Sequence, residues 1–331
     1  MAGRKTNVAL AGLLAVAAVS GIVSYGIGTG WARPVIVLHA TAALAILVLA
    51  PWKSSIMKRG LRHRRDGALL SIALAVFVVI TIVSGVSHSV FNVESLGPVT
   101  IMQIHVTAAL IAIAFGVAHI RRRPQRMRVS DLSRRTFLRT AGLAATAAIG
   151  FVAIEGAARA VGLPGGHRRF TGSHEKGSFD PVAMPVTSWI NDTPPRFNAG
   201  QITVTTSDTV ATLTIEHLAA FDDHMVATLD CTGGWYATQK WSGARLSRVV
   251  SAPGSSIRVI STTGYERRFP IEAAEHLLLA THAAGAPLSV GHGAPVRLVA
   301  PGRRGFWLVK WVSEIVVDDR PAWWQPPFPL T

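Results

Sequence analysis

The most distinctive stretch of the sequence lies near its carboxyl end and reads Gly291-His292-Gly293-Ala294-Pro295-Val296-Arg297-Leu298-Val299, then Pro301-Gly302-Arg303-Arg304-Gly305-Phe306-Trp307-Leu308-Val309-Lys310-Trp311. Glycine permits sharp turns and close backbone approach, and basic side chains donate charge-assisted hydrogen bonds to anions. From about residue 170 the chain is polar, with Pro and Gly punctuation, and has the length of one soluble domain. The stretch therefore predicts turns that carry cationic donors inside that domain.

A single cysteine lies upstream, in Ala227-Thr228-Leu229-Asp230-Cys231-Thr232-Gly233-Gly234-Trp235. The residues before Cys231 alternate like the end of a strand, and the two glycines after it allow an immediate turn. One cysteine excludes an intramolecular disulfide. A thiolate at such a turn can project into a pocket and ligate a soft metal, whereas the alternative is a small buried apolar side chain.

Together with 241–246 and 261–271, which includes Thr263-Gly264-Tyr265, these segments resemble the sulfite-oxidase-like molybdopterin domain and occur in its order. The resemblance implies an α+β fold of mixed, mostly antiparallel sheets around a molybdenum-molybdopterin cofactor. It implies that Cys231 is the one protein ligand to molybdenum and that Tyr265 acts in the bordering pocket. It also implies that the pterin is held by His292, Gly293, Arg297, Gly302, Gly305 and Lys310.

Two departures from the family bear on the substrate. Thr232-Gly233-Gly234-Trp235 follows Cys231, where sulfite-oxidising members often have arginines that help to bind an anion. This form is closer to the bacterial sulfoxide-reducing relatives. The segment 280–285 reads Ala-Thr-His-Ala-Ala-Gly, where relatives commonly have Tyr-Glu-x-Asn-Gly. The resemblance thus favours reduction of a sulfoxide-like small molecule over sulfite-type oxidation, and it leaves the substrate itself open.

The first half of the chain contains five nearly charge-free stretches, Val8–Tyr25, Pro34–Trp52, Ala68–Val86, Val99–Ile120 and Ala141–Ala160. Each has about the length that a helix needs to cross a bilayer. We therefore expect a membrane helical bundle, in contact with lipid, before the soluble domain.

The charge distribution argues against nucleic acid as a partner. Residues 1–140 hold 17 basic and 3 acidic residues, and the remaining residues hold 16 and 15. The excess lies in alternate loops between the apolar stretches, which is the positive-inside pattern. It predicts a multi-pass protein of the cell membrane with a cytoplasmic N-terminus and an extracytoplasmic C-terminal domain. Because that domain is nearly neutral, we do not expect it to bind DNA or RNA.

The apolar half contains an internal repeat. His39-Ala40-Thr41-Ala42-Ala43-Leu44 recurs as His105-Val106-Thr107-Ala108-Ala109-Leu110, and Ser20-Gly21 recurs as Ser84-Gly85. Two copies of a helical pair predict a four-helix bundle, which resembles the cytochrome b anchors of membrane oxidoreductases. The resemblance implies that His39 and His105 are axial ligands of a haem b that exchanges electrons with the quinone pool or another redox partner. The alternative is that these histidines only form hydrogen bonds between helices.

His119 lies 14 residues after His105 and could serve a second, inner haem. Its equivalent in the first repeat is Lys53, which is not a haem ligand.

Ser133-Arg134-Arg135-Thr136-Phe137-Leu138-Arg139 precedes the fifth apolar stretch and resembles the twin-arginine export signal. The resemblance implies that the twin-arginine translocase exports the domain already folded around its cofactor. The alternative is that the arginines only continue a cytoplasmic basic cluster. Ala158-Arg159-Ala160 is similar to a small-residue cleavage site, but we expect the fifth helix to be retained as an anchor.

The sequence thus predicts a transmembrane bundle over residues 1–125, the export motif and a fifth helix over 126–165, and a molybdopterin oxidoreductase domain over 166–331. Two other hypotheses remain open. The domain could be a catalytically inactive scaffold, or the helices could be an electron-transfer module for a separate exported partner.

Overall fold

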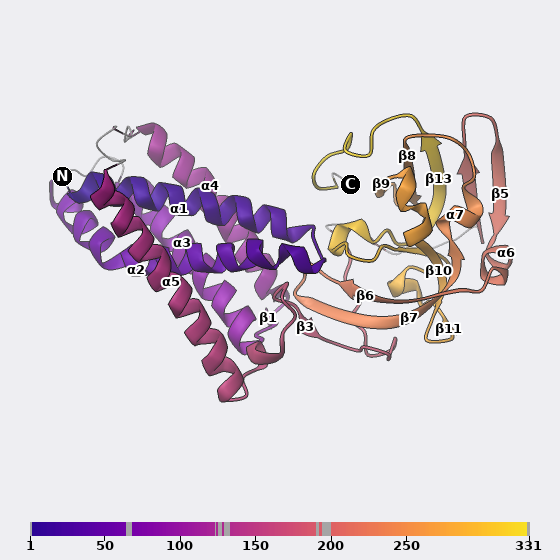
Figure 1. Ribbon diagram of the computed structural model, residues 1–331, viewed down its shortest axis with the longest axis horizontal. Helices are drawn as coiled ribbons and strands as arrows, with labels where there is room; N and C mark the ends of the chain where they lie inside the picture. The colour runs from indigo at the N-terminus through magenta and orange to yellow at the C-terminus, as the bar shows by residue number, and fades with distance from the viewer. Residues whose placement is uncertain are drawn as a thin grey trace. The chain divides into compact units, whose positions relative to one another are not determined.

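The computed structural model describes residues 2–63, 68–122, 124, 128, 133–189, 192–193 and 200–329. The chain divides into two compact units. The first comprises Met1–Tyr25 and Gly30–His174, and the second comprises Gly26–Thr29 and Glu175–Thr331. Figure 1 labels the helices and strands of both units.

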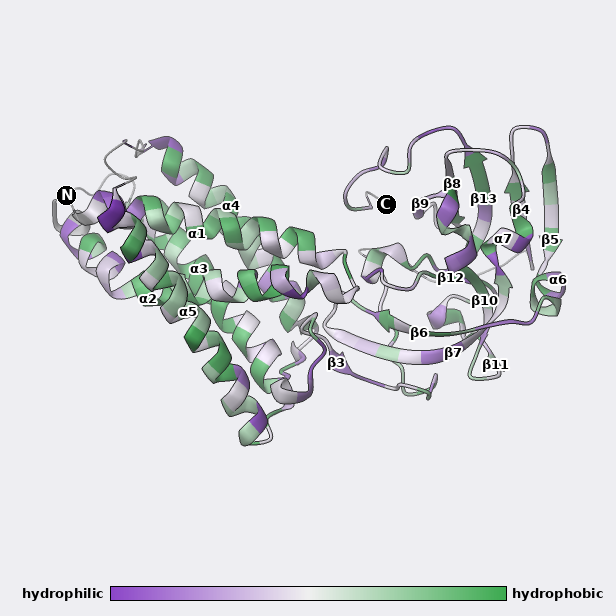
Figure 2. Cartoon of the chain, in the orientation of Figure 1, coloured by the Kyte–Doolittle hydropathy of each residue, from purple (hydrophilic) through white to green (hydrophobic). Residues whose placement is uncertain are grey.

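Long helices build the first unit: α1 (Ala2–Tyr25), α2 (Arg33–His63), α3 (Ala68–Phe91), α4 (Ile101–Arg122) and α5 (Arg134–Ala160). Among the described residues, five helices are long and apolar enough to cross a membrane. Figure 2 shows hydrophobic residues along all of them. Large apolar side chains point outward, with Leu69 exposed by 84% and Ile149 by 69%. Such a surface is typical of helices that contact lipid.

Short elements lie between these helices, namely η1 (Gly30–Ala32), β1 (Ser95–Leu96) and β2 (Val99–Thr100), and η3 (Pro164–His167) follows α5. Helix α1 packs on α2, α3 packs on α4, and α5 packs on α2. Ala42 and Ala108, at equivalent places in the two repeats, are both buried. Small side chains allow membrane helices to approach closely. The sequence repeat therefore corresponds to two similar helical pairs.

The second unit contains two sheets. The six-stranded sheet has the order β11-β10-β7-β3, with β12 also paired to β10 and β6 to β7. Its strands are β3 (His174–Glu175), β6 (Asp223–Asp230), β7 (Trp235–Arg245), β10 (Leu278–Ala283), β11 (Ala286–Pro287) and β12 (Arg297–Val299). In its long hairpin, Asp230 pairs with Tyr236 and Asp223 with Gly243. The hairpin turn carries Cys231.

The five-stranded sheet has the order β5-β4-β13-β8-β9. Its strands are β4 (Gln201–Thr205), β5 (Val210–Thr214), β8 (Ser256–Ser261), β9 (Glu266–Pro270) and β13 (Val312–Asp318). Strand β13 pairs in parallel with β4 and antiparallel with β8. The predicted mixed, mostly antiparallel sheets are therefore confirmed.

Short helices complete this unit: α6 (Ile215–Ala220), α7 (Leu246–Val249), η4 (Ile271–His276), η5 (Val290–His292) and η6 (Gly305–Trp307). The core contains fully buried Trp241, Trp311 and Leu279. Trp241 donates a hydrogen bond to the carbonyl of Ala227, 3.0 Å away, which ties its ring to the neighbouring strand. These large side chains fix the strands from which the functional residues project.

Residues 26–29 belong to the second unit although they follow α1 in the sequence. Ile27 forms an isolated antiparallel bridge with Arg303, and the amide of Gly28 donates to the carbonyl of Gly302 over 2.9 Å. The predicted domain of residues 166–331 does not contain Gly26–Thr29, and it starts before the break that follows His174.

Candidate active site

The sulfur of Cys231 lies at the turn between β6 and β7. The amide of Cys231 donates to the carbonyl of Trp235 over 2.8 Å, and Gly234 closes the turn with φ of 97°. The sulfur accepts a hydrogen bond from the amide of Gly233 at 3.2 Å, and the residue is only 8% exposed. Burial raises the pKa of the Cys231 thiol, against smaller opposing effects of Gly233 and Arg304. A bound soft cation is the usual way in which such a buried sulfur becomes a thiolate.

A buried ion pair fixes the residue before Cys231. Nε of Arg304 donates to Oδ1 of Asp230 over 3.0 Å, with side-chain exposures of 7% and 1%. Nη2 of Arg304 also reaches the carbonyl of Cys231 at 3.4 Å. Because Arg304 lies 73 residues further along the chain than Cys231, this pair joins the two distant segments that the sequence singled out.

Arg297 is a buried cation beside this turn. It lies 2% exposed on β12, donates from Nη1 to the carbonyl of His292 at 3.0 Å, and stacks 5.3 Å from the ring centre of Trp241. Its Nε is buried with no hydrogen-bond partner among the described residues. Burial lowers the pKa of Arg297 to about 10.

Lys310 is the second cation of the pocket. Its Nζ donates to the carbonyls of Thr187 and Gly291, at 2.8 and 2.7 Å. Burial first, and the charge of Arg297 next, lower the pKa of Lys310 to about 8. In the described part of the chain, no ion pair joins Arg297 or Lys310 to a carboxylate. Arg297 is buried and Lys310 is half-buried. Removing unpaired cations from water is costly, so these residues fit an anionic ligand such as a pterin phosphate.

His292 is held by the protein through both ring nitrogens. Its Nδ1 lies 2.8 Å from Oγ of Ser289, and its Nε2 lies 3.0 Å from the carbonyl of Met184. Burial lowers the pKa of His292, and Arg297 and Lys310 act in the same direction. The ring therefore orders two loops, while its main-chain carbonyl receives Arg297.

Tyr265 lines the pocket from the turn between β8 and β9. Its hydroxyl donates to the carbonyl of Phe306 over 2.5 Å, and the residue is 4% exposed. This bond holds the main chain at Phe306, whose side chain also lines the pocket.

Among the predicted glycines, Gly305 lines the pocket with φ of 47°, and an added Cβ there would lie 2.5 Å from Cγ2 of Thr232. A side chain at Gly305 would displace the turn that carries Cys231. Gly293 and Gly302 do not line the pocket. An added Cβ at Gly302 would meet Thr29, so that glycine serves the packing of residues 26–29.

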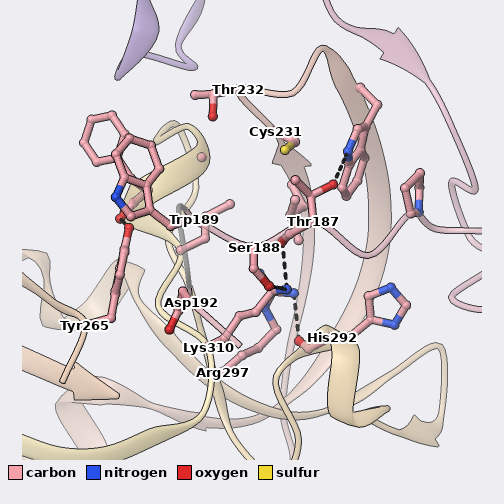
Figure 3. A pocket seen from close by; sticks show the side chains of 16 residues that line it. Thr187, Ser188, Trp189, Asp192, Cys231, Thr232, Tyr265, His292, Arg297 and Lys310 are labelled. Carbon is pink, nitrogen blue, oxygen red and sulfur yellow. Dashed lines mark hydrogen bonds between the residues drawn. The ribbon is translucent and has the colours of Figure 1, made fainter. Parts of the chain in front are cut away.

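The pocket encloses about 620 Å³ of empty space, its open mouth included. The predicted residues that it brings together are Cys231, Tyr265, His292, Arg297, Gly305 and Lys310. In Figure 3, Trp189, Tyr265 and Asp192 lie on one side and His292 on the other.

Sequence reasoning missed Thr187, Ser188, Trp189 and Asp192, which come from the irregular segment before β4. Trp189 and Asp192 could have been found as a tryptophan and an acidic residue in an irregular segment, since functional residues concentrate on loops.

The first unit brings together the other predicted pair, His39 and His105. Their ring centres lie 6.1 Å apart, and the ring planes are inclined by 76°. Each Nδ1 lies 2.8 Å from a helix carbonyl, that of Ala17 for His39 and that of Thr81 for His105. Each Cε1 lies 3.1 Å from the place of an added Cβ, at Gly21 and Gly85 respectively. The sequence repeat therefore extends to the contacts of each imidazole.

Comparisons with known proteins bear on the second unit. Residues 193–324 match the family described as the oxidoreductase molybdopterin binding domain. The chain is 29% identical over 152 residues to mitochondrial sulfite oxidase of Rattus norvegicus, which covers 34% of this chain and 28% of that protein. It is 31% identical over 126 residues to the protein-methionine-sulfoxide reductase catalytic subunit MsrP of Xanthomonas axonopodis pv. citri, covering 30% of this chain and 39% of that protein.

The crystal structure of the sulfane dehydrogenase SoxCD from Paracoccus pantotrophus is similar over 36% of this chain and 38% of that chain, with 24% identity and a TM-score of 0.34. The chain thus spans less than two fifths of the length of each of these relatives. The family match includes Cys231, Arg297 and Lys310, the residues that form the thiol and cation cluster. Residues 193–324 of the second unit therefore match an oxidoreductase molybdopterin binding domain, and part of the chain is similar to part of sulfite oxidase and of MsrP.

Proposed function

We propose that this chain is a membrane-anchored molybdenum-cofactor oxidoreductase that reduces a sulfoxide-like small molecule. The single observation that carries the proposal is the buried thiol of Cys231 in one pocket with Arg297 and Lys310, two cations that form no ion pair with a carboxylate among the described residues. Cys231 would ligate molybdenum, and the two cations would neutralise the anionic pterin.

The cofactor, when bound, supplies two-electron oxygen-atom transfer. Reduction of a sulfoxide consumes two electrons and two protons and gives a sulfide and water. The protein supplies orientation and charge around this reaction. The Asp230–Arg304 pair holds the Cys231 turn in place. The aromatic ring of Phe306, 5.7 Å from that of Trp189, forms an apolar wall that limits access of water.

Sulfite-type oxidation is the second candidate, motivated by the relatives named sulfite oxidase. It requires a site for a small dianion, which arginine side chains near the metal would supply. Among the described residues that line the pocket, Arg297 is the one arginine, and we assign it to the cofactor. Purified holoenzyme assayed with methionine sulfoxide and reduced dye, and with sulfite and an oxidised dye, separates the two. Turnover of sulfite alone would reject the reductase.

The paired histidines support a haem b in the first unit. Two imidazoles that ligate one metal from opposite sides, about 2 Å from nitrogen to metal, have ring centres about 6 Å apart. The observed 6.1 Å between His39 and His105 agrees with this value. With each Nδ1 near a carbonyl, Nε2 remains for the metal, the usual arrangement of a histidine ligand. The haem would pass single electrons between the quinone pool and the molybdenum domain.

Absorption spectra of membranes test the haem. We expect a b-type band in the wild type that is lost in His39→Ala and in His105→Ala. His119→Ala is the matched control and should keep the band, because its Nδ1 lies 3.3 Å from Ser71 and Lys53 occupies the equivalent place in the other repeat. A band that survives in both His39→Ala and His105→Ala would refute the ligand assignment.

Localisation follows from the same proposal. Five apolar helices would anchor the chain in the cell membrane, and the basic loops would keep the N-terminus in the cytoplasm. The Arg134-Arg135 motif would direct the folded, loaded domain through the twin-arginine translocase. Replacing both arginines by lysine should leave the domain inside the cell, accessible to protease only after lysis; unchanged export would contradict this route.

A further inference from the structure

The pocket contains a carboxylate that neither the cofactor nor the thiol requires. Asp192 is half-buried in the lining and lies outside the matched family segment, which begins at residue 193. Burial raises the pKa of Asp192, while a hydrogen bond from the side chain of Thr263 and the charge of Lys310 oppose that shift. A carboxylate in an active-site pocket sets which charges can enter.

Lys310 does not neutralise Asp192 by direct pairing. Its Nζ is directed to the carbonyls of Thr187 and Gly291 and to Oγ of Ser188, at 2.8, 2.7 and 3.4 Å. These contacts direct the ammonium group towards the main-chain carbonyls, and its charge acts on Asp192 without a direct contact. No salt bridge within 4.0 Å connects Asp192 to a described cation. The carboxylate therefore remains available to a ligand in the pocket.

Aromatic rings adjoin Asp192 in the lining. Trp189 and Phe306 meet edge to face at 5.7 Å, and Phe328 contacts the far part of this cluster at 5.5 Å from Phe306. Figure 3 shows Trp189 and Tyr265 on the same side of the pocket as Asp192. Aromatic faces and a carboxylate attract organic cations and repel oxyanions.

We propose that Asp192 and the rings of Trp189, Tyr265 and Phe306 form a substrate subsite that selects a cationic organic oxygen donor, such as a sulfoxide bearing a protonated amine, and excludes anions. This inference rests on the proposed reductase function. It assigns Arg297 and Lys310 to the cofactor and leaves Asp192 as the charged group that meets the substrate. The apolar part of the substrate packs on the rings, and its ammonium lies opposite the carboxylate.

Two sulfoxides of similar size and opposite charge test the subsite. Methionine sulfoxide methyl ester carries a protonated amine at about pH 6, and N-acetylmethionine sulfoxide carries a carboxylate. With the loaded, full-length protein and reduced dye, kcat/KM for the ester should exceed that for the acetylated compound by about tenfold or more. Asp192→Asn should reduce this ratio by about tenfold. Asp208→Asn is the matched control, since Asp208 is exposed and not in the pocket lining, and it should leave the ratio unchanged.

Binding gives a second readout that is independent of turnover. The corresponding sulfones carry the same charges, and a ligand that binds the folded protein raises its Tm. The cationic sulfone should raise the Tm of the wild type more than the anionic one, and Asp192→Asn should remove the difference. The subsite is refuted if the wild type and Asp192→Asn prefer the cationic ligand over the anionic one to the same degree. It is also refuted if the wild type prefers the anionic ligand. If the wild type turns over neither sulfoxide but still binds the cationic sulfone more tightly than the anionic one, the reductase function is refuted and the subsite is supported.

Discussion

At the residue scale, Cys231 is the position with the sharpest expected effect. Its sulfur contacts the amide of Gly233 and the side chain of Thr187 inside the pocket, and a serine oxygen can keep both contacts while changing the donor to the metal. We expect Cys231→Ser to lose about 100-fold or more in turnover, because serine oxygen is a harder ligand than thiolate. The Tm should change little. Turnover and Tm of the same preparation check this, and a variant with wild-type turnover would exclude Cys231 as the ligand.

The Asp230–Arg304 pair makes a prediction about stability. With Asp230 1% exposed, Arg304→Met leaves a buried carboxylate without its ion-pair partner, which costs about 3–5 kcal/mol of the free energy of unfolding. Adding Asp230→Asn to that variant should recover at least about 1 kcal/mol, since the uncompensated charge is gone. Urea unfolding measures both. A double variant no more stable than Arg304→Met alone would show that the charge is not the cause.

Sequence predicted part of this pocket and missed another part for a physical reason. Cys231 follows the end of β6, Arg297 begins β12 and Lys310 precedes β13. Glycines lie near all three in the sequence, and the structure places them in one lining. Trp189 and Asp192 carry no periodic pattern because their segment has no regular structure, and only tertiary packing brings them to the pocket. The family resemblance implied that His292 holds the pterin, and this role stays a prediction; in the structure its ring contacts Oγ of Ser289 and the carbonyl of Met184.

At the element scale, the edge of the five-stranded sheet is fixed by a salt bridge from β9 to the end of β13. Arg268, 5% exposed in its side chain, pairs with Asp318, 29% exposed, and Nη2 donates to Oδ2 over 2.9 Å. The hydrogen bond from Arg268 lowers the pKa of Asp318 below its ordinary value of 3.8. The stabilisation is therefore complete above about pH 4 and is lost as the pH falls from there through the lowered pKa.

We expect Asp318→Asn to lower the free energy of unfolding by about 2 kcal/mol at neutral pH. The variant should also lose less stability than the wild type on acidification, because it lacks the carboxylate of Asp318 that becomes protonated. Tm measured at neutral pH and at about pH 3 gives both effects. Asp319→Asn, at an exposed neighbouring position, is the control and should behave like wild type. An equal acid sensitivity of Asp318→Asn and wild type would contradict the assignment.

The helical elements were predictable because their signal is local. Apolar length marks each helix, and the Ser-Gly and His repeats mark two equivalent pairs, whose imidazoles make matching contacts at 2.8 Å. The helix ends were less predictable, since α2 extends to His63, beyond the apolar stretch that ends at Trp52. Ser133, which we interpreted as part of the export motif, also caps α5 by accepting from the amide of Thr136. Its presence therefore has a local structural reason as well.

At the scale of the whole molecule, the sequence predicted a helical part surrounded by lipid and a domain surrounded by water. The charge asymmetry and the apolar stretches distinguish the helical part from the domain, and the structure divides into two units. The sequence did not predict that Gly26–Thr29 belong to the second unit. Ile27 and Arg303 pair through backbone atoms although most of the chain lies between them. Backbone pairing over such a separation leaves no pattern in side-chain type.

The central claim is that the second unit binds a molybdenum cofactor through Cys231. Molybdenum and pterin quantified per chain in the purified full-length protein test it most directly. We expect about one molybdenum and one pterin per chain. We also expect a marked loss of both in Arg297→Met, which removes a buried cation from the site. Wild-type protein without molybdenum, from cells that load a control molybdoenzyme, would contradict it.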